Sequence, residues 1–363
     1  MSVLAAIAVL ATLIVVHELG HFVAARSQGI HVNRFSVGFG PTLFKYQGAE
    51  TEYAVRAIPL GGYVGFPDDD PDSKIPLNDP NLLRNRPVID RAIVISAGVI
   101  ANLIFAYFLL VTQIGTIGVP QLNYQPGVLV PKVATEVSAA AVNAGIKSGD
   151  IVLAVEGKEL GASKEALPSL MQLIQEHSNQ PLALTIQRDN ETLSVSVTPE
   201  LGPDGKGRIG VQLGPNGKVE RHRAANLVEA FRLGAVEFER ITVAVAQGFV
   251  QLVSNFSQTA DQLAGPIKIV EIGANIAQSD AGSLFQFAAL ISINLAIMNI
   301  LPLPALDGGQ LAFLLIEGLS GKPLPTKIQD GVMQTGLMVL LGLGIFLIVR
   351  DTANLGWVQN LLQ

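Results

Sequence analysis

Four apolar stretches divide the sequence, and each is long enough to cross or enter a membrane. They run over residues 3–25, 92–117, 284–301 and 332–349. A helix needs about 20 apolar residues to span the hydrocarbon core of a bilayer, so the last two stretches lie near the short limit. The first has the position of a cleavable signal peptide, but no basic residue precedes Arg26, and its apolar part ends in ionisable side chains. We therefore expect four transmembrane helices.

The polar stretches between these spans predict further elements. Residues 34–40 and 51–58 have strand patterns separated by turn-forming glycines, which predicts a β-hairpin or small sheet. Residues 68–87 are rich in Asp and Pro and favour a loop. Residues 225–258 repeat apolar side chains at helical spacing, which predicts an amphipathic helix that lies on the membrane surface or packs against a soluble module.

A soluble α/β module is predicted over residues 127–215, which have about the length of a domain. Its short strands and helices are expected at residues 127–130, 138–144, 151–155, 169–178, 182–187 and 192–197. The pattern as a whole predicts a polytopic α-helical membrane protein with a membrane-associated β-hairpin and an inserted α/β domain. We divide the chain into an N-terminal membrane part, the module, a linker-helix region and a C-terminal membrane part, at residues 1–117, 118–215, 216–283 and 284–363.

Composition supports the membrane assignment and narrows the chemistry. The 363 residues are 49% hydrophobic and 15% charged, whereas soluble proteins carry about 25% charged residues. The absence of cysteine excludes thiolate zinc sites, so a metal would have to be held by His and carboxylate side chains. The net charge of −6, without any interleaving of basic and aromatic residues, argues against a nucleic-acid partner.

The distribution of Lys and Arg predicts how the chain crosses the membrane. Residues 26–91 carry eight basic side chains, and the first 25 residues carry none. Because basic loops stay on the cytoplasmic side, we expect the N-terminus and residues 118–283 outside, and the ends of spans one and three at the cytoplasmic side. A multi-pass protein of a bacterial-type inner membrane fits this pattern, and a chloroplast or thylakoid-type membrane remains open.

The strongest chemical signal is His17-Glu18-Leu19-Gly20-His21, inside the first span. Histidines four residues apart lie on one face of a helix and can hold one metal ion, and Glu18 beside them can take a proton from the attacking water. The motif alone is short and occurs by chance. Ionisable groups within a span are costly in lipid, however, and mark functional sites, so we favour a metal site over side chains that merely reach into the interface.

A zinc site needs a third protein ligand, and Asp307 is the best candidate. It follows the third span in the segment Asn299–Gly309, where Pro302 and Pro304 break the helix. Irregular backbone at membrane depth is tolerated only where protein buries it or where it lines a cavity. Spans one and three are expected to end at the same depth, which brings Asp307 to the histidines. The alternative is that Asp307 only caps the next helix.

These motifs, taken in order, resemble those of the site-2 protease family of intramembrane zinc metalloproteases, in the form that carries one PDZ domain and acts in bacterial sigma-E pathways. The resemblance rests on the His17–His21 motif and the Asn299–Gly309 segment. It extends to Gly61-Gly62-Tyr63-Val64, to Ala97-Gly98-Val99 with Asn102, and to Gly265-Pro266-Ile267. Val99 stands where the family pattern has a proline, which affects only the local helix shape.

The resemblance implies roles for individual residues. It implies that His17, His21 and Asp307 bind one zinc ion and that Glu18 is the catalytic base. Substrate-binding roles near the metal are implied for Asn294, Asn299, Pro302 and Pro304. The segment 34–58 is similar to the family's membrane-reentrant β element, whose edge could pair with an unwound substrate strand.

Residues 139–150 resemble the helix-and-turn signature of bacterial PDZ domains. On this resemblance, the strand Gly127-Val128-Leu129-Val130 is expected to bind a peptide through its backbone. The alternative is that the module acts sterically and binds no peptide.

The expected activity is hydrolysis of a peptide bond in a single-span membrane protein, such as an anti-sigma-factor-like protein, within or near the bilayer and after a first trimming cleavage. Membrane lipid is the other expected partner.

Two other functional classes remain as alternatives. A scaffold with an inactive protease fold predicts no bound zinc, and a metal transporter predicts ionisable residues along several spans, which spans two and four lack.

Overall fold

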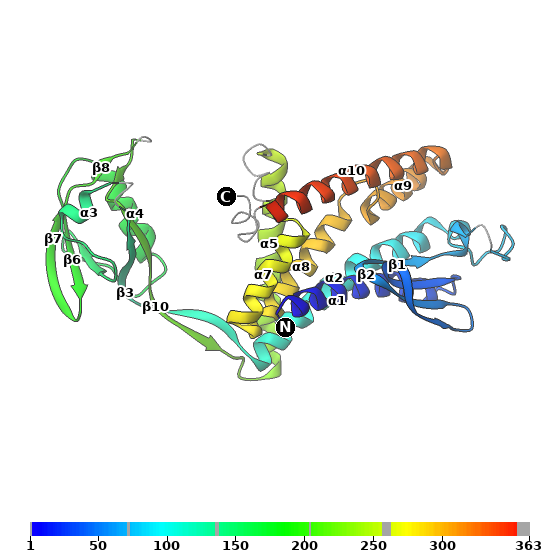
Figure 1. The fold of residues 1–363 in the computed structure, drawn as a ribbon, viewed down its shortest axis with the longest axis horizontal. Coiled ribbons are helices and arrows are strands. Elements are labelled where there is room, and N and C mark those ends of the chain that lie inside the picture. Colours follow the sequence, from blue (N-terminus) through cyan, green and yellow to red (C-terminus); the bar gives the residue numbers. More distant parts are fainter. Residues whose placement is uncertain (1, 71–72, 135–137, 203–204, 256–262, 354–363) are drawn as a thin grey trace. The chain divides into compact units, whose positions relative to one another are not determined.

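The computed structural model divides the chain into two compact units (Figure 1). The membrane unit comprises Met1–Val119 and Arg223–Gln363, and the sheet module comprises Pro120–His222. The residues that the structure describes are 2–70, 73–134, 138–202, 205–255 and 263–353. The module therefore continues past residue 215, where the sequence pattern ends it, because its last strand runs on to His222.

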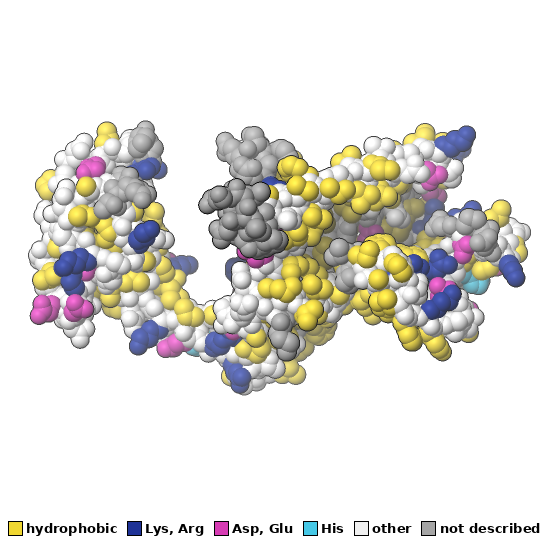
Figure 2. All heavy atoms as spheres, in the orientation of Figure 1, with side chains coloured by type: hydrophobic (Ala, Val, Ile, Leu, Met, Phe, Trp, Pro, Cys, Tyr) yellow, Lys and Arg dark blue, Asp and Glu magenta, His cyan; other side chains and the backbone are white. Residues whose placement is uncertain are grey.

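Four helices in the described part of the chain are long and apolar enough to cross a membrane, in agreement with the sequence. They are α1 (Ser2–Ser27), α2 (Val88–Thr116), the segment Ala281–Ile300 that contains α8 (Leu284–Ile300), and α10 (Thr326–Ala353). Large apolar side chains of α10 such as Met338, Val339 and Phe346 are more than 60% exposed, and Figure 2 shows that apolar side chains cover this helix. A surface of this kind suits contact with lipid.

The amphipathic helix predicted around residues 225–258 is α5 (Leu227–Ser254). It begins with Asn226 as N-cap, whose side chain accepts from the Glu229 N–H, and the Glu229 side chain in turn accepts from the Ala225 N–H just before the helix. Its buried face packs against α2 and α8, where Ile241 joins a common apolar core. The linker region also forms α7 (Pro266–Ser279), which packs against α1.

The predicted hairpin is a more folded sheet made from two long strands, β1 (Arg34–Gln47) and β2 (Glu52–Gly65). The first part of β1, residues 34–37, pairs with residues 52–55 in parallel and with residues 62–65 in antiparallel fashion. Residues 42–47 pair with the start of β2 around the turn. Among the described residues, 62–65 therefore form one edge of this sheet and 42–47 the other.

The sheet module has one main sheet in the strand order β10-β3-β4-β6-β7, with β5 added to β4. Its strands are β3 (Val119–Val133), β4 (Ile151–Val155), β5 (Lys158–Glu159), β6 (Leu182–Arg188), β7 (Glu191–Val197) and β10 (Val211–His222), and β8 (Glu200–Leu201) pairs with β9 (Gly207–Arg208). The helices α3 (Ala140–Asn143) and α4 (Ala166–Glu176) accompany the sheet, and Leu170 of α4 lies in its apolar core.

The segment Gly127–Val130, which is expected to bind a peptide, lies within β3. β3 lies between β10 and β4 in the sheet, with Val128 paired to Val152 of β4. On its other side, the Asn216 side chain donates to the Pro126 carbonyl and the Ala134 N–H donates to the Gly210 carbonyl. The outer strand on this side of the sheet is β10, and peptide binding by Gly127–Val130 stays a prediction.

Candidate active site

The two histidines of the first span face α2 at a point where the two helices approach closely. A Cβ atom added to Gly20 would lie 2.4 Å from the Ala97 carbonyl oxygen, a separation that real Cβ atoms do not reach. A Cβ added to Gly98 would lie 2.3 Å from His21 Nε2 and 2.8 Å from His17 Cε1. Gly20 therefore lets α1 approach α2 closely, and Gly98 leaves the room that the two imidazole rings occupy between these helices.

The third predicted ligand reaches the histidines from the start of α9 (Asp307–Ser320). α8 ends at Ile300, and a short segment turns the chain into α9. Within it Ala305 has a left-handed φ of 68°, a conformation that non-glycine residues adopt at a cost and that clusters at functional sites. Cβ atoms at Gly308 and Gly309 would lie 2.1 Å and 2.4 Å from carbonyl oxygens of the same turn. The segment is thus folded tightly onto the start of α9, which fixes Asp307.

Three donor atoms converge at this point. His17 Nε2 lies 3.2 Å from Asp307 Oδ2, His21 Nε2 lies 3.4 Å from the same oxygen, and the two Nε2 atoms are 3.3 Å apart. Bonds of about 2.0–2.1 Å to a tetrahedral zinc ion place neighbouring ligand atoms about 3.3 Å apart. Within the described residues, Asp307 Oδ2 is buried without a hydrogen-bond partner, and no second group of three metal-binding side chains occurs. The donor set fits zinc in both chemistry and spacing.

The rings are held from behind by α2. His21 Nδ1 lies 2.9 Å from the Val94 carbonyl oxygen, and His17 Nδ1 lies 3.3 Å from Asn102 Nδ2. A hydrogen bond from Nδ1–H to a carbonyl leaves Nε2 with its lone pair free, which is the form a metal requires. For His21 this arrangement is complete.

Glu18 lies against the β1–β2 sheet. A Cβ added to Gly62 would lie 3.0 Å from Glu18 Cγ and 2.9 Å from the Ser36 carbonyl oxygen. The Gly61-Gly62 pair therefore lets the strand edge 62–65 pass directly beside the carboxylate. A base next to three metal-binding atoms and an open strand edge is an arrangement suited to hydrolysing an extended peptide.

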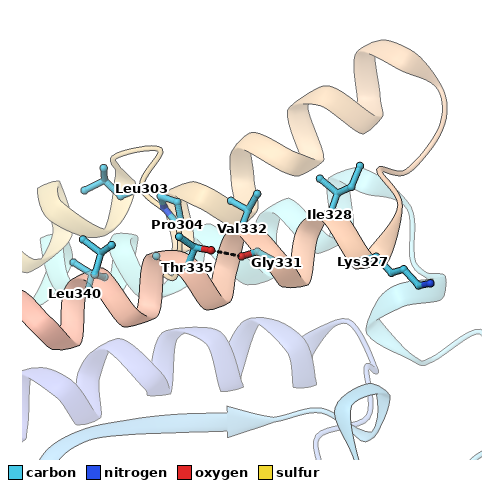
Figure 3. Close-up of a pocket in the computed structure, with 10 residues that line it drawn as sticks. Leu303, Pro304, Lys327, Ile328, Gly331, Val332, Thr335 and Leu340 are labelled. Atoms are coloured by element: carbon cyan, nitrogen blue, oxygen red, sulfur yellow. Dashed lines mark hydrogen bonds between the residues drawn. The ribbon is translucent and has the colours of Figure 1, made fainter.

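Among the four residues with expected substrate-binding roles, Asn299 is nearest to the metal-binding atoms, with Nδ2 3.5 Å from His17 Nε2. Asn294 is exposed on α8, and Pro302 is exposed after its end. Pro304 lines an apolar cavity of about 540 Å³ with side chains of α10 such as Val332 and Leu340 (Figure 3). No described contact tests a substrate role for these residues, and the roles remain proposals.

Sequence comparisons place these features in a known context. A family model described as peptidase family M50 matches residues 5–343. A Nostoc sp. protein described as a candidate zinc metalloprotease is 68% identical over 367 residues and covers all of both chains. The chloroplastic membrane metalloprotease ARASP of Arabidopsis thaliana is 49% identical over 363 residues, covering 99% of this chain and 81% of that protein. The regulator of sigma-W protease RasP of Bacillus subtilis is 28% identical over 432 residues, covering 98% and 99%.

A comparison of structures matches a smaller part of the chain. A PDZ domain from Listeria innocua covers 24% of this chain and 92% of that domain, at 20% identity and a TM-score of 0.20. This likeness is too weak to carry an argument about the module, and its peptide-binding role stays a proposal.

Proposed function

Since the chain belongs to peptidase family M50, the site-2 protease family of membrane zinc metalloproteases, we propose that it cuts a single-span membrane protein within or near the bilayer, after another protease has trimmed that protein. The observation that carries this proposal is the triangle of His17, His21 and Asp307 donor atoms, which lies within the membrane unit with Glu18 beside it. We assign one zinc ion per chain to that triangle.

Each side chain at the site has a defined task in peptide hydrolysis. Zinc, when bound, lowers the pKa of a coordinated water to about 7 and polarises the scissile carbonyl. His17, His21 and Asp307 would hold the zinc ion through one donor atom each. Glu18 accepts a proton from the attacking water and passes it to the leaving amine. Asn299, whose Nδ2 lies 3.5 Å from His17 Nε2, would orient the substrate backbone through its amide.

The activity is tested on purified chain in lipid vesicles with a single-span reporter whose outer domain has been removed. We expect about one zinc per chain, loss of cleavage on chelation, and recovery on adding zinc back. A reporter that keeps a bulky outer domain is expected to be cut much more slowly. Stoichiometric zinc without any cleavage would favour the scaffold, and zinc accumulating inside the vesicles would favour the transporter.

The substrate is proposed to bind as an added strand at the edge 62–65 of the β1–β2 sheet. A helical peptide bond is shielded, so the substrate has to unwind before it is cut, and an open strand edge offers its backbone new hydrogen-bond partners. Two edges exist, but edge 62–65 passes beside Glu18, whereas residues 42–47 pair at the opposite side of the sheet. The position of Gly62 against Glu18 Cγ is what favours the first edge.

The absence of cysteine in the chain gives a clean test of this edge. We expect a single cysteine at Tyr63, on the edge 62–65, to form a disulfide with a cysteine placed beside the scissile bond of a trapped, uncut substrate. The matched control is a cysteine at Phe44, which is 64% exposed on the opposite edge and is expected to give only background cross-linking. Equal yields at the two positions, or cross-linking at Phe44 alone, would contradict strand addition beside Glu18.

The sidedness of the site is proposed from the charge distribution. Residues 26–91 hold eight basic side chains, so we assign the metal-binding ends of α1 and α8 to the cytoplasmic side and the sheet module to the outer side. The relative named as a regulator of sigma-W protease supports a regulatory membrane protein, such as an anti-sigma-factor-like protein, as the kind of substrate.

A further inference from the structure

Asn102 is a buried polar residue in the middle of the transmembrane helix α2, one helical turn after Gly98. Its side chain is fully buried, and its Nδ2 atom lies 3.3 Å from His17 Nδ1. Among the described residues, its Oδ1 atom has no hydrogen-bond partner. The backbone at this position is fixed from the other side, because Ser292 Oγ of α8 donates to the Asn102 carbonyl at 2.8 Å. An amide half satisfied at membrane depth is costly, so its environment calls for an explanation.

The chemistry of His17 decides which of the two amide atoms faces its ring. Its Nε2 atom is one corner of the donor triangle, so Nε2 must carry a lone pair and Nδ1 must carry the proton. The Nδ1–H then needs an acceptor, and the atom facing it must be the amide oxygen. A half-turn of the amide about its last bond exchanges Nδ2 and Oδ1, which are nearly identical in shape. After that exchange the oxygen accepts from the ring, the amide nitrogen takes the place that the oxygen had, and the ring has the tautomer that a metal requires.

The second histidine shows the same arrangement with a different acceptor. His21 Nδ1 faces the Val94 carbonyl at 2.9 Å, also on α2. Val94 and Asn102 are eight residues apart on one helix, which places them two turns apart on the same face. The partner of His21 Nδ1 on α2 is a backbone carbonyl, whereas the partner of His17 Nδ1 on the same helix is the side-chain amide of Asn102.

We propose that Asn102 is a positioning residue of the metal site: its amide oxygen accepts the His17 Nδ1–H and thereby fixes the ring orientation and tautomer that present Nε2 to zinc. The inference rests on the zinc role of His17 and adds a further residue to it. Hydrogen-bond partners behind metal-binding histidines contribute about 10- to 100-fold to metal affinity. Removing the acceptor is therefore expected to weaken zinc binding rather than to unfold the protein.

The test is a zinc titration against a competing chelator on the full chain in detergent. We expect Asn102→Leu, which has a similar volume and no acceptor, to bind zinc about 10- to 100-fold more weakly. Asn102→Asp, which keeps an acceptor oxygen, is expected to remain within a few-fold of the parent chain. Asn102→Ala serves as a second deletion of the acceptor where the leucine variant does not accumulate.

The matched control lies on the same helix. Gln113 is also an amide with no exposed surface, and neither of its side-chain polar atoms has a hydrogen-bond partner among the described residues, but it lies three turns further along α2. Gln113→Leu is expected to leave zinc affinity unchanged, and the thermal stability of the zinc-free proteins shows which variants are folded. Three results would overturn the inference. The first is zinc affinity like that of the parent chain in both Asn102→Leu and Asn102→Ala, and the second is an equal loss of zinc affinity in Gln113→Leu. The third is zinc binding by Asn102→Asp that is as weak as that of Asn102→Leu. A parent chain that binds no zinc would instead overturn the proposed function.

Discussion

Glu18→Gln is expected to reduce reporter cleavage about 1000-fold or more while zinc remains bound. Positioned general bases contribute about 10²–10⁴-fold, and here the same group also returns the proton to the leaving amine. Glutamine keeps the shape of the side chain beside Gly62 but cannot accept the proton. The metal-binding atoms belong to His17, His21 and Asp307, so the zinc content should equal that of the parent chain.

The control for this substitution is Glu239→Gln, the same chemical change at an exposed position on α5. That variant is expected to cut the reporter at the parent rate. Cleavage and zinc content are measured on the same preparations in vesicles. Appreciable cleavage by the Glu18→Gln protein would remove Glu18 from the reaction, and loss of zinc from it would mean that Glu18 belongs to the metal site itself.

Gly98→Ala is expected to abolish zinc binding, and cleavage with it, although it adds a single methyl group. The new Cβ would lie 2.3 Å from His21 Nε2, 2.6 Å from His21 Cε1 and 2.8 Å from His17 Cε1. Both rings would have to move away from α2, and in moving they would lose the spacing of about 3.3 Å that the donor triangle needs. His21 would also lose its hydrogen bond to the Val94 carbonyl.

Gly115→Ala provides the comparison, because it makes the same change on the same helix. Its Cβ would meet only the Ala230 Cβ, at 3.5 Å, an ordinary contact. Alanine is also the better helix former, so this variant is expected to fold, bind zinc and cut the reporter like the parent chain. The measurements are zinc per chain and cleavage rate, and stoichiometric zinc in Gly98→Ala would show that the rings have more freedom than the packing implies.

The spans and the cluster of candidate metal ligands could be predicted from the sequence because each depends on a local pattern. Runs of apolar residues mark α1, α2, α8 and α10, and the four-residue spacing of His17 and His21 puts both rings on one helix face. The prediction of Asp307 required one further inference, that spans one and three end at the same depth in the membrane. The structure brings these three side chains together as expected.

The importance of α2 to the site could not be predicted in the same way. Gly98 and Asn102 form part of a recognisable motif, but hydropathy does not say which face of a span turns toward which neighbour. Only the packing of α2 against α1 shows that Gly98 makes room for the rings and that Asn102 lies behind His17. The same holds for the edges of the β1–β2 sheet. The sequence pattern predicted strands within residues 34–58, but the pairing of residues 62–65 with residues 34–37 depends on the tertiary fold.

The ligands of the metal site are divided between the two ends of the chain, with the whole sheet module between His21 and Asp307. Translation and membrane insertion proceed from the N-terminus, so α1 enters the bilayer with His17 and His21 but without Asp307. A chain still on the ribosome therefore carries only two of the three proposed zinc ligands. The proposed zinc site can be completed only after α9 has emerged.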